Sequence, residues 1–481
     1  MKKYLFFRKK YPKFIFEKYN WKVFKNGLEI SFYFKILSDI ELRPKVIIKN
    51  VKKAQIERAG DKVLNNLIFN LGLIEMLSYW KSTCSPKIEI LASPLNKKQI
   101  KWWKDLILKG MGQFFYENKI NFRNPNLIKI KSINKIHDYE KCLRVKNLNE
   151  NEVLMPIGGG KDSIVTLEVL KKMKKNLVLF SLNPTETSKR IIEISGEKKS
   201  IFVKRKFDKK LFELNRKGFL NGHTPFTAYL SFLTILLAVL FDIKYIAFSN
   251  ERSSEEGNIK YLGRWINHQY SKSFDFEKRF RDYSKKYLAK NIEYFSFLRP
   301  LYEIQIAKLF SNYPKYFNTF LSCNEAYKTY GGTKKPLKKW CGKCPKCLFI
   351  FASLYPFIGE KIIKIFGPAR NASHSDAGGK NLFEDKNLLP LMLQLIGEKK
   401  FKPFECVGTK KESLIAFYLN LKKYRGQASV KLPFLLKYFE EKILPKYSNL
   451  ERESKKLLNS WSNQNYLPPH LKSILRRTTK Q

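Results

Sequence analysis

The sequence has no apolar stretch long enough to cross a membrane or to act as a signal peptide. Residues 1–10 are basic and contain no long apolar core, so a secretory signal is not expected. The most apolar run, residues 226–241, is shorter than a bilayer requires, and Asp242 and Lys244 follow it. We interpret this run as a buried helix and expect a cytoplasmic protein without membrane insertion.

Cysteine is scarce, since the chain has seven among 481 residues. Four of them, Cys323, Cys341, Cys344 and Cys347, combine a tight Cys-x2-Cys-x2-Cys motif with one remote cysteine. This spacing favours a metal and a reducing compartment over disulfides. Four thiolates would complete a closed, structural zinc site that joins two loops. An iron–sulfur cluster is the alternative.

Acidic residues are few: 42 Asp and Glu stand against 93 Lys and Arg, which gives a formal charge of +51. Such a charge could indicate a nucleic-acid surface. The basic residues, mostly Lys, are however spread along the whole chain, as expected from a compositional bias with Lys on solvated faces. An anionic substrate fits both interpretations, and we expect no nucleic-acid partner.

No internal repeat or low-complexity linker divides the chain, but the apolar pattern changes along it. Residues 28–36 and 45–48 alternate as antiparallel strands do, and residues 64–80 and 96–116 have helical spacing. We therefore predict a small α+β domain over residues 1–147.

From residue 153 onward, strands and helices alternate, which predicts a central parallel sheet with both faces covered. The later strands are expected at residues 177–182, 200–203 and 245–249. Helices are expected at residues 388–396, 412–423 and 432–447, and the basic tail after Trp461 is expected to be only partly ordered. These patterns predict an α/β domain over residues 148–355 and a helical domain over residues 356–481.

One turn combines the features of a phosphate-binding loop. Four of the five residues 153–157 are apolar, which predicts a buried strand; three glycines follow, and residues 164–172 have helical spacing. Amide groups and the positive end of the helix dipole would face an anion there. The motif is not a Walker loop, because Asp162 follows Lys161, nor a dinucleotide fingerprint, because residue 163 is Ser.

The hexapeptide Gly158-Gly-Gly-Lys-Asp-Ser163 resembles the PP-loop, usually Ser-Gly-Gly-x-Asp-Ser, of enzymes that split ATP between its α and β phosphates. Gly158 departs from that pattern and removes one hydroxyl. The resemblance implies a PP-loop (HUP-like) sheet within the adenine nucleotide alpha hydrolase-like superfamily. It also implies that Gly158, Gly159, Gly160, Lys161 and Ser163 bind pyrophosphate and that Asp162 binds Mg²⁺. A glycine-rich turn without a ligand is the alternative.

Polar loops follow the strands at the edge where such sheets bind ligands. Ser249, Asn250 and Glu251 directly follow a buried strand, and we expect them beside the nucleotide. Asn267-His-Gln-Tyr-Ser-Lys-Ser273 is dense in hydrogen-bonding side chains. Either loop could instead be an ordinary solvated surface.

Two families share further motifs with this chain. Arg299-Pro-Leu, a helix and then the clustered cysteines resemble 7-cyano-7-deazaguanine synthases over residues 150–350. A longer resemblance is to the MurL-like UDP-N-acetylmuramoyl-L-alanyl-L-glutamate epimerases of peptidoglycan synthesis. It spans nearly the whole chain and includes the PP-loop-like hexapeptide, residues 221–225, 267–273 and 402–408, and the cysteines.

The epimerase resemblance implies a specific reaction. The α-carboxylate of the terminal L-Glu would attack the α-phosphorus of ATP, and the resulting acyl-adenylate would acidify the Cα proton. Removal of that proton, its return on the other face and hydrolysis would give D-Glu and AMP. Mg²⁺ would offset phosphate charge, and Arg264, His268 and Lys272 would hold the anionic UDP or muramoyl-peptide part.

General acid–base work suits groups that titrate near neutrality, which makes Cys406, His374, His223 and His268 candidates for proton transfer. No spacing selects a pair among them, and His374 or Cys406 alone could be an ordinary loop residue. A PP-loop enzyme that modifies a tRNA base, a deazaguanine-type synthase and a non-enzymatic binding module are the alternatives. Nothing in the sequence indicates the oligomeric state.

Overall fold

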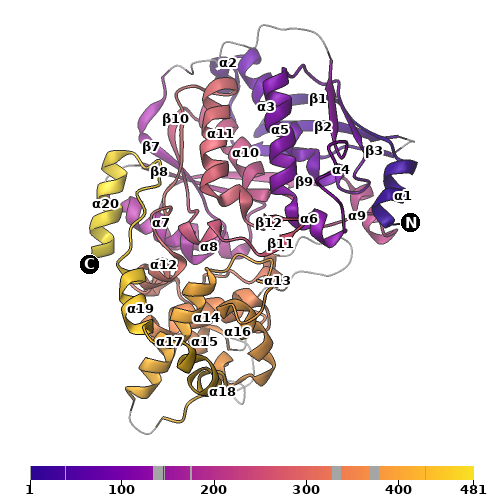
Figure 1. The fold of residues 1–481 in the computed structure, drawn as a ribbon. Coiled ribbons are helices and arrows are strands. Elements are labelled where there is room, and N and C mark those ends of the chain that lie inside the picture. Colours follow the sequence, from indigo (N-terminus) through magenta and orange to yellow (C-terminus); the bar gives the residue numbers. More distant parts are fainter. Residues whose placement is uncertain are drawn as a thin grey trace.

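The computed structural model describes residues 2–37, 40–133, 145, 147–173, 176–327, 337, 339–367, 379–427 and 430–480. A large mixed sheet forms its centre, helices pack on the sheet, and the helices between residues 345 and 458 gather at one end of the molecule, whereas the last helix lies beside the sheet (Figure 1). The strand order is β13-β10-β7-β8-β9-β4-β2-β1-β5-β6, with β3 paired to β2.

Five consecutive positions in this sheet are parallel, and four of these strands match the ones that the sequence predicts, whereas β13 was not predicted. They are β13 (Glu293–Ser296), β10 (Ile243–Phe248), β7 (Asn149–Pro156), β8 (Asn176–Leu182) and β9 (Lys199–Lys206). Strand β7 lies between β10 and β8, so the chain reverses its direction of progress across the sheet at β7. Loops after β7 and β10 therefore meet at the ligand-binding edge of the sheet.

The N-terminal strands extend the same sheet. They are β1 (Lys13–Phe24), β2 (Gly27–Ile36), β3 (Ile40–Leu42), β4 (Lys45–Lys49), β5 (Lys87–Ile90) and β6 (Lys129–Ser132). The antiparallel pairing predicted around residues 28–48 is confirmed. Strand β4 also pairs antiparallel with β9, from Lys45 opposite Lys206 to Ile48 opposite Val203. The boundary predicted at residue 147 thus falls between strands of one sheet, and it stays a prediction.

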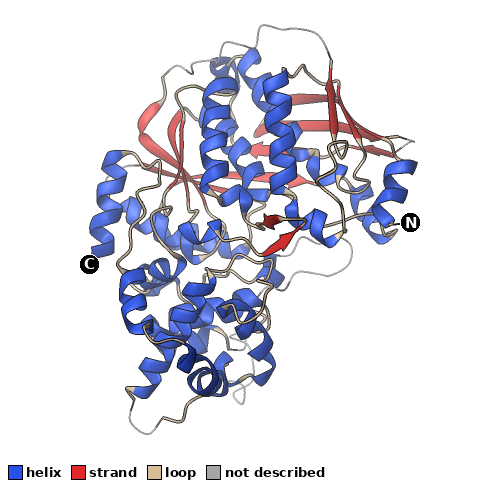
Figure 2. Ribbon diagram, viewed as in Figure 1, coloured by secondary structure: helices blue, strands red, loops and turns tan. Residues whose placement is uncertain are grey.

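Side chains of the central strands alternate between two cores. Leu154 of β7 packs in the core that contains the N-terminal helices, whereas Val153 and Met155 pack in the core of the C-terminal helices. The first core includes α2 (Lys53–Ala59), α3 (Asp61–Glu75), α5 (Lys97–Gly110), α10 (Phe226–Leu240) and α11 (Phe274–Tyr287). Of these, α3, α5 and α11 lie in front of the strands in Figure 2. The second includes α7 (Lys161–Lys171), α8 (Glu186–Ser195), α12 (Glu303–Phe310) and α14 (Pro345–Ile358).

The C-terminal region is helical, as predicted. It contains α15 (Lys361–Ile365), α16 (Leu389–Ile396), α17 (Lys410–Arg425), α18 (Phe434–Tyr438), α19 (Leu450–Leu458) and α20 (Pro469–Lys480). Helix α14 crosses residue 355, so that predicted boundary also stays a prediction. The expectation of a partly ordered tail is wrong, because α20 buries Leu471 and Leu475 in the second core.

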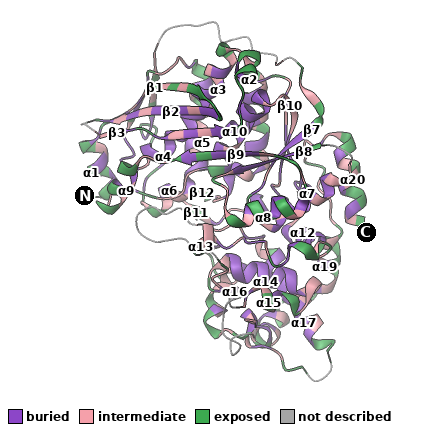
Figure 3. Ribbon diagram, turned by 180° about the vertical axis from the view of Figure 1, so that it is seen from behind, coloured by how far each residue is buried: buried purple, intermediate pink, exposed green. Residues whose placement is uncertain are grey.

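The remaining elements are short. They are α1 (Lys3–Lys10), α4 (Leu77–Trp80), α6 (Gly112–Glu117), α9 (Lys209–Arg216), α13 (Asn324–Tyr327), and the hairpin strands β11 (Ile259–Tyr261) and β12 (Arg264–Ile266). Figure 3 shows buried residues concentrated on the strands and on α10 and α14. Helix α10 is the apolar run of residues 226–241, and its interior position confirms a buried helix. Across the described residues, every helix is too short or too polar to span a bilayer.

Candidate functional site

The glycine turn follows β7 at the ligand-binding edge. Helix α7 begins at Lys161, and Gly160 is its N-cap residue. Within the described part of the chain, the amide groups of residues 158–163 donate no hydrogen bond. The Ser163 hydroxyl donates to the Gly160 carbonyl oxygen at 2.8 Å, which closes the turn. The free amides and the start of the helix give this turn the donors that an anion needs.

Only one side of the turn is filled. A Cβ at Gly159 would lie 2.4 Å from the Tyr327 hydroxyl, and one at Gly160 would lie 2.8 Å from Ser322 Oγ. A Cβ at Gly158 would meet nothing within 4 Å. Gly159 has a φ of +102°, a conformation that side chains disfavour. The turn is therefore packed beneath Gly159 and Gly160 and open at Gly158.

Three carboxylates meet beside this turn: those of Asp162 in the first turn of α7, Glu251 after β10 and Glu303 at the start of α12. Their oxygens lie within 4.8 Å of one another. Lys161 is buried and forms ion pairs with Asp162 and Glu303. The structure thus directs the Lys161 ammonium group to these carboxylates. We call Asp162, Glu251 and Glu303 the carboxylate cluster.

Glu251 and Glu303 differ in their charge environment. Burial raises the pKa of Glu251 to about 7, and the negative charges of Glu303 and Asp162 add to this effect against the attraction of Lys272. Burial acts in the same direction on Glu303, but Lys161 and Lys346 outweigh it and lower its pKa to about 2. Both carboxylate oxygens of Glu251 are buried and accept no hydrogen bond within the described residues. Such an unsatisfied carboxylate is unusual in a folded core.

Lys272 and Cys406 join this cluster from distant parts of the chain. The Lys272 ammonium nitrogen lies 3.4 Å from Cys406 Sγ. Desolvation alone would lower the pKa of Lys272, but Cys406 and the cluster carboxylates raise it above its ordinary value. The fold therefore brings together four of the predicted site residues, namely Asp162, Glu251, Lys272 and Cys406.

Two of the predicted histidines form a pair beside Lys272. The ring centroids of His223 and His268 are 4.4 Å apart, and His268 Nδ1 lies 2.5 Å from Gln113 Oε1 of α6. Desolvation and the nearby Lys272 and Lys402 lower the pKa of His268 to about 3. Desolvation and His268 hold the pKa of His223 well below its usual value. Both rings are neutral at pH 7. The third predicted histidine, His374, lies outside the described residues.

Other predicted residues have different surroundings. Arg264 donates to the Leu108 carbonyl oxygen, and its guanidinium group lies 4.2 Å from the Phe122 ring, toward the N-terminal helices. Asn250 donates to Ser296 Oγ at 3.1 Å. Ser249 Oγ is buried and has no hydrogen-bond partner in the described chain.

The sequence interpretation missed two charged residues of this site. Glu303 completes the carboxylate cluster, and the Lys346 ammonium nitrogen lies 3.6 Å from Glu303 Oε1. Glu303 was visible only as the first residue of a helix after Arg299-Pro-Leu, where acidic residues are common. Lys346 lies between two of the clustered cysteines and resembled an ordinary surface lysine.

The four predicted cysteines do meet. The sulfur atoms of Cys323, Cys341, Cys344 and Cys347 lie within 4.8 Å of one another, and the Cys341 and Cys347 sulfurs are 3.6 Å apart. Two backbone amides point at this group, from Lys343 to Cys341 Sγ and from Cys347 to Cys344 Sγ, each at 3.4 Å. An all-sulfur set of four, supported by amide donors, fits a tetrahedral metal ion.

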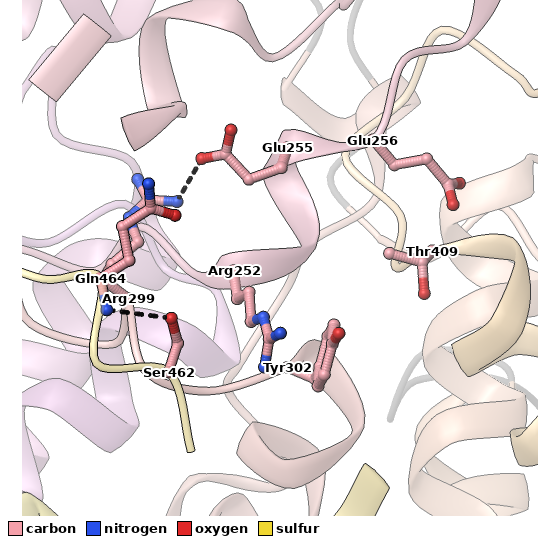
Figure 4. A pocket seen from close by; sticks show the side chains of 8 residues that line it. All are labelled: Arg252, Glu255, Glu256, Arg299, Tyr302, Thr409, Ser462 and Gln464. Carbon is pink, nitrogen blue, oxygen red and sulfur yellow. Dashed lines mark hydrogen bonds and ion pairs between the residues drawn. The ribbon is translucent and has the colours of Figure 1, made fainter. Parts of the chain in front are cut away.

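A separate cavity of about 270 Å³ includes residues of the 252–256 segment in its lining. It is lined by Arg252, Glu255, Glu256, Arg299, Tyr302, Thr409, Ser462 and Gln464 (Figure 4). Arg299 pairs with Glu255 at 3.1 Å, and Arg252 lies 4.5 Å from the Tyr302 ring. None of the three cluster carboxylates lines it, so this cavity is distinct from the carboxylate cluster.

Comparisons with known proteins give the same family over most of the chain. A family model described as the MurL N-terminal domain matches residues 6–297, and one described as the MurL C-terminal domain matches residues 319–440. The chain is 32% identical to a UDP-N-acetyl-alpha-D-muramoyl-L-alanyl-L-glutamate epimerase of Micromonospora sp. over 363 residues, which are 74% of this chain and 75% of the relative. Proteins of that name from Salinispora tropica (33% over 358 residues; 74% and 73% covered) and Xanthomonas oryzae pv. oryzae (33% over 348 residues; 72% of each) are similarly close.

Proposed function

The chain belongs to the MurL family, and from this we propose that it inverts the α-carbon of the terminal L-Glu in UDP-MurNAc-L-Ala-L-Glu, with ATP as the driving substrate. The product would enter peptidoglycan precursor synthesis. The meeting of Asp162, Glu251, Lys272 and Cys406 beside a glycine turn with free amides is the observation that carries this proposal. The relatives favour this function over modification of a tRNA base or a deazaguanine precursor.

ATP would activate the glutamate before its α-proton moves. An α-carboxylate oxygen attacks the α-phosphorus, the bond from that phosphorus to the bridging oxygen breaks, and pyrophosphate leaves. Without this step, loss of the Cα proton would place two negative charges on adjoining atoms. The PP-loop assignment is supported by the free amides of residues 158–163, which would hold the phosphates.

The carboxylate cluster fits a magnesium ion. Its donors are all oxygens, as Mg²⁺ prefers, and the two oxygens of Glu251 accept no hydrogen bond within the described residues. A bound ion would offset the charge of the ATP phosphates. Asp162, Glu251 and Glu303 would hold it, and Lys161 would balance the remaining negative charge.

Proton transfer needs one group on each face of the glutamate α-carbon. Cys406 is our candidate for one face, because the Lys272 ammonium group can pair with its sulfur after the thiol has lost its proton. The His223–His268 pair is our candidate for the other, because it lies beside Lys272 and the contact with Gln113 fixes the orientation of the His268 ring. Water then cleaves the acyl-adenylate to release the D-Glu product and AMP.

The four cysteines would hold a structural zinc ion. A closed set of four thiolates leaves no position for a substrate, so the ion would stabilise the loops around Cys323 and Cys341 and take no part in the reaction.

Product analysis tests the proposal. Purified protein is incubated in D₂O with UDP-MurNAc-L-Ala-L-Glu, ATP and Mg²⁺, and nucleotides and deuterium at the glutamate α-carbon are measured. We expect AMP, pyrophosphate and ATP-dependent deuterium uptake. Formation of ADP, or deuterium uptake that is equally fast without ATP, would contradict the mechanism.

A further inference from the structure

The two Cys-x-Lys-Cys units of the metal site place equivalent lysines in opposite environments. Lys343 precedes Cys344, and Lys346 precedes Cys347, so each is the last residue before a cysteine ligand. Lys343 is exposed, whereas Lys346 is only 5% exposed. A buried lysine is costly unless its ammonium group has partners, so the contacts of Lys346 are informative.

Lys346 contacts the loop that carries Cys406 at two points. Its backbone amide donates to Glu405 Oε2 at 2.7 Å, and its ammonium group donates to the Cys406 carbonyl oxygen. The same ammonium nitrogen lies 3.6 Å from Glu303 Oε1. One residue of the metal-binding segment therefore reaches both the Cys406 backbone and the carboxylate cluster.

The remaining anchors of this loop lie at other positions. The Lys402 amide donates to the Asn258 carbonyl oxygen at 3.1 Å, and the Asn258 side chain donates to the Pro403 carbonyl oxygen at 2.7 Å. On the far side, Gly408 packs against the Phe349 ring of α14. These contacts hold the two ends of residues 402–408. In the middle, Lys346 holds the Cys406 backbone, Lys272 contacts the Cys406 sulfur, and the Phe404 ring packs against Tyr116 and His268.

We propose that Lys346 is a positioning residue that couples the four-cysteine metal site to Cys406 and Glu303. The inference rests on the proposed function for the catalytic role of Cys406, but the mechanical coupling does not depend on it. With the metal bound, the cysteines fix the backbone of α14 at Lys346, and Lys346 fixes the Cys406 backbone opposite Lys272. Loss of the Lys346 side chain, or of the metal, releases Cys406 from that position.

The test compares Lys346→Met with Lys343→Met, which removes the equivalent lysine of the neighbouring unit. Both variants should retain their metal and their circular dichroism spectrum. We expect iodoacetamide to alkylate Cys406 faster in Lys346→Met than in the wild type, and at the wild-type rate in Lys343→Met, as measured by mass spectrometry of the Cys406 peptide. We also expect kcat to fall roughly 10- to 100-fold in Lys346→Met, with the KM for ATP nearly unchanged and partial recovery in Lys346→Arg.

Two further measurements keep the test decisive if Lys346→Met folds poorly. Glu405→Ala removes one contact from the loop side and leaves the cysteine segment intact, and it should also speed alkylation of Cys406. Chelation of the metal from wild-type protein should have the same effect while the circular dichroism is still native. Equal alkylation rates in Lys346→Met, Glu405→Ala, the metal-free protein and the wild type would overturn the coupling. The variants or the metal-free protein could also show faster alkylation of Cys406 although the wild type has no epimerase activity. That result would support the coupling and reject only the proposed function.

Discussion

Replacement of Glu251 by Gln should stabilise the protein while it removes a functional group. Glu251 is 1% exposed, and neither carboxylate oxygen accepts a hydrogen bond within the described residues. Because burial and the neighbouring carboxylates raise its pKa, ionisation of Glu251 works against the folded state of the metal-free protein. Gln has nearly the same shape and does not ionise. The gain in stability should therefore appear only at pH values at which the carboxyl group of wild-type Glu251 is charged.

The expected size and pH range follow from the pKa. Below about pH 4.5 the carboxyl is protonated in both the folded and the unfolded chain. As the pH rises toward 7, the unfolded chain loses this proton while the folded chain keeps it, so the free energy of unfolding falls. A pKa raised from 4.5 to about 7 corresponds to a total loss of about 3 kcal/mol. The free energy of unfolding of Glu251→Gln should thus exceed that of the wild type by about 3 kcal/mol at pH 8 and by under about 1 kcal/mol at pH 5.

Urea unfolding of metal-free protein at the two pH values measures this difference. Glu303→Gln is the matched control from the same cluster, because Lys161 and Lys346 overcome the effect of burial and lower the pKa of Glu303. The stability that Glu303 contributes is present above its unfolded pKa and is lost as the pH falls toward 2, so its replacement should destabilise the protein at pH 8. A Glu251→Gln variant that is less stable than the wild type at pH 8, or a gain that is independent of pH, would refute this reasoning.

Three further predictions concern the metals and the glycine turn. Asp162→Asn should abolish turnover and leave the circular dichroism unchanged, and substantial activity would remove Asp162 from the magnesium role. Cys344→Ser should lose zinc in elemental analysis and unfold at lower temperature, because three thiolates no longer close the site; full zinc content would contradict this assignment. Gly159→Ala should cost about 2 kcal/mol in urea unfolding, since its φ is +102° and its Cβ would meet Tyr327, whereas Gly158→Ser should be tolerated. Equal stability of these two glycine variants would contradict the described packing of the turn.

Local patterns were sufficient to predict the elements around the site. The apolar strand, three glycines and helix around residue 160 have the predicted order, and α10 is the buried helix expected from its apolar run. Parallel strands end at one edge of a sheet, which is why Asp162 and Glu251 could be expected together. Cys406 and Lys272 come from loops with no such rule, and the sequence indicated them only through their residue types and the family resemblance.

Other features depend on contacts that leave no local signal. Nothing in residues 45–49 or 199–206 indicates that β4 pairs with β9, because strand pairing over that separation is set by the tertiary fold. The burial of Lys346 depends on Glu405 and Cys406, about sixty positions later. The basic tail resembled a solvated segment because only Leu471, Leu475 and Thr478 of α20 are buried.

The central claim is that the glutamate α-carboxylate attacks the α-phosphorus of ATP beside the glycine turn. Substrate labelled with ¹⁸O in that carboxylate tests it directly, with AMP and pyrophosphate analysed by mass spectrometry after turnover. We predict that AMP acquires one labelled oxygen and pyrophosphate acquires none, because water cleaves the adenylate at the acyl carbon. Unlabelled AMP, or label in the pyrophosphate, would contradict the account.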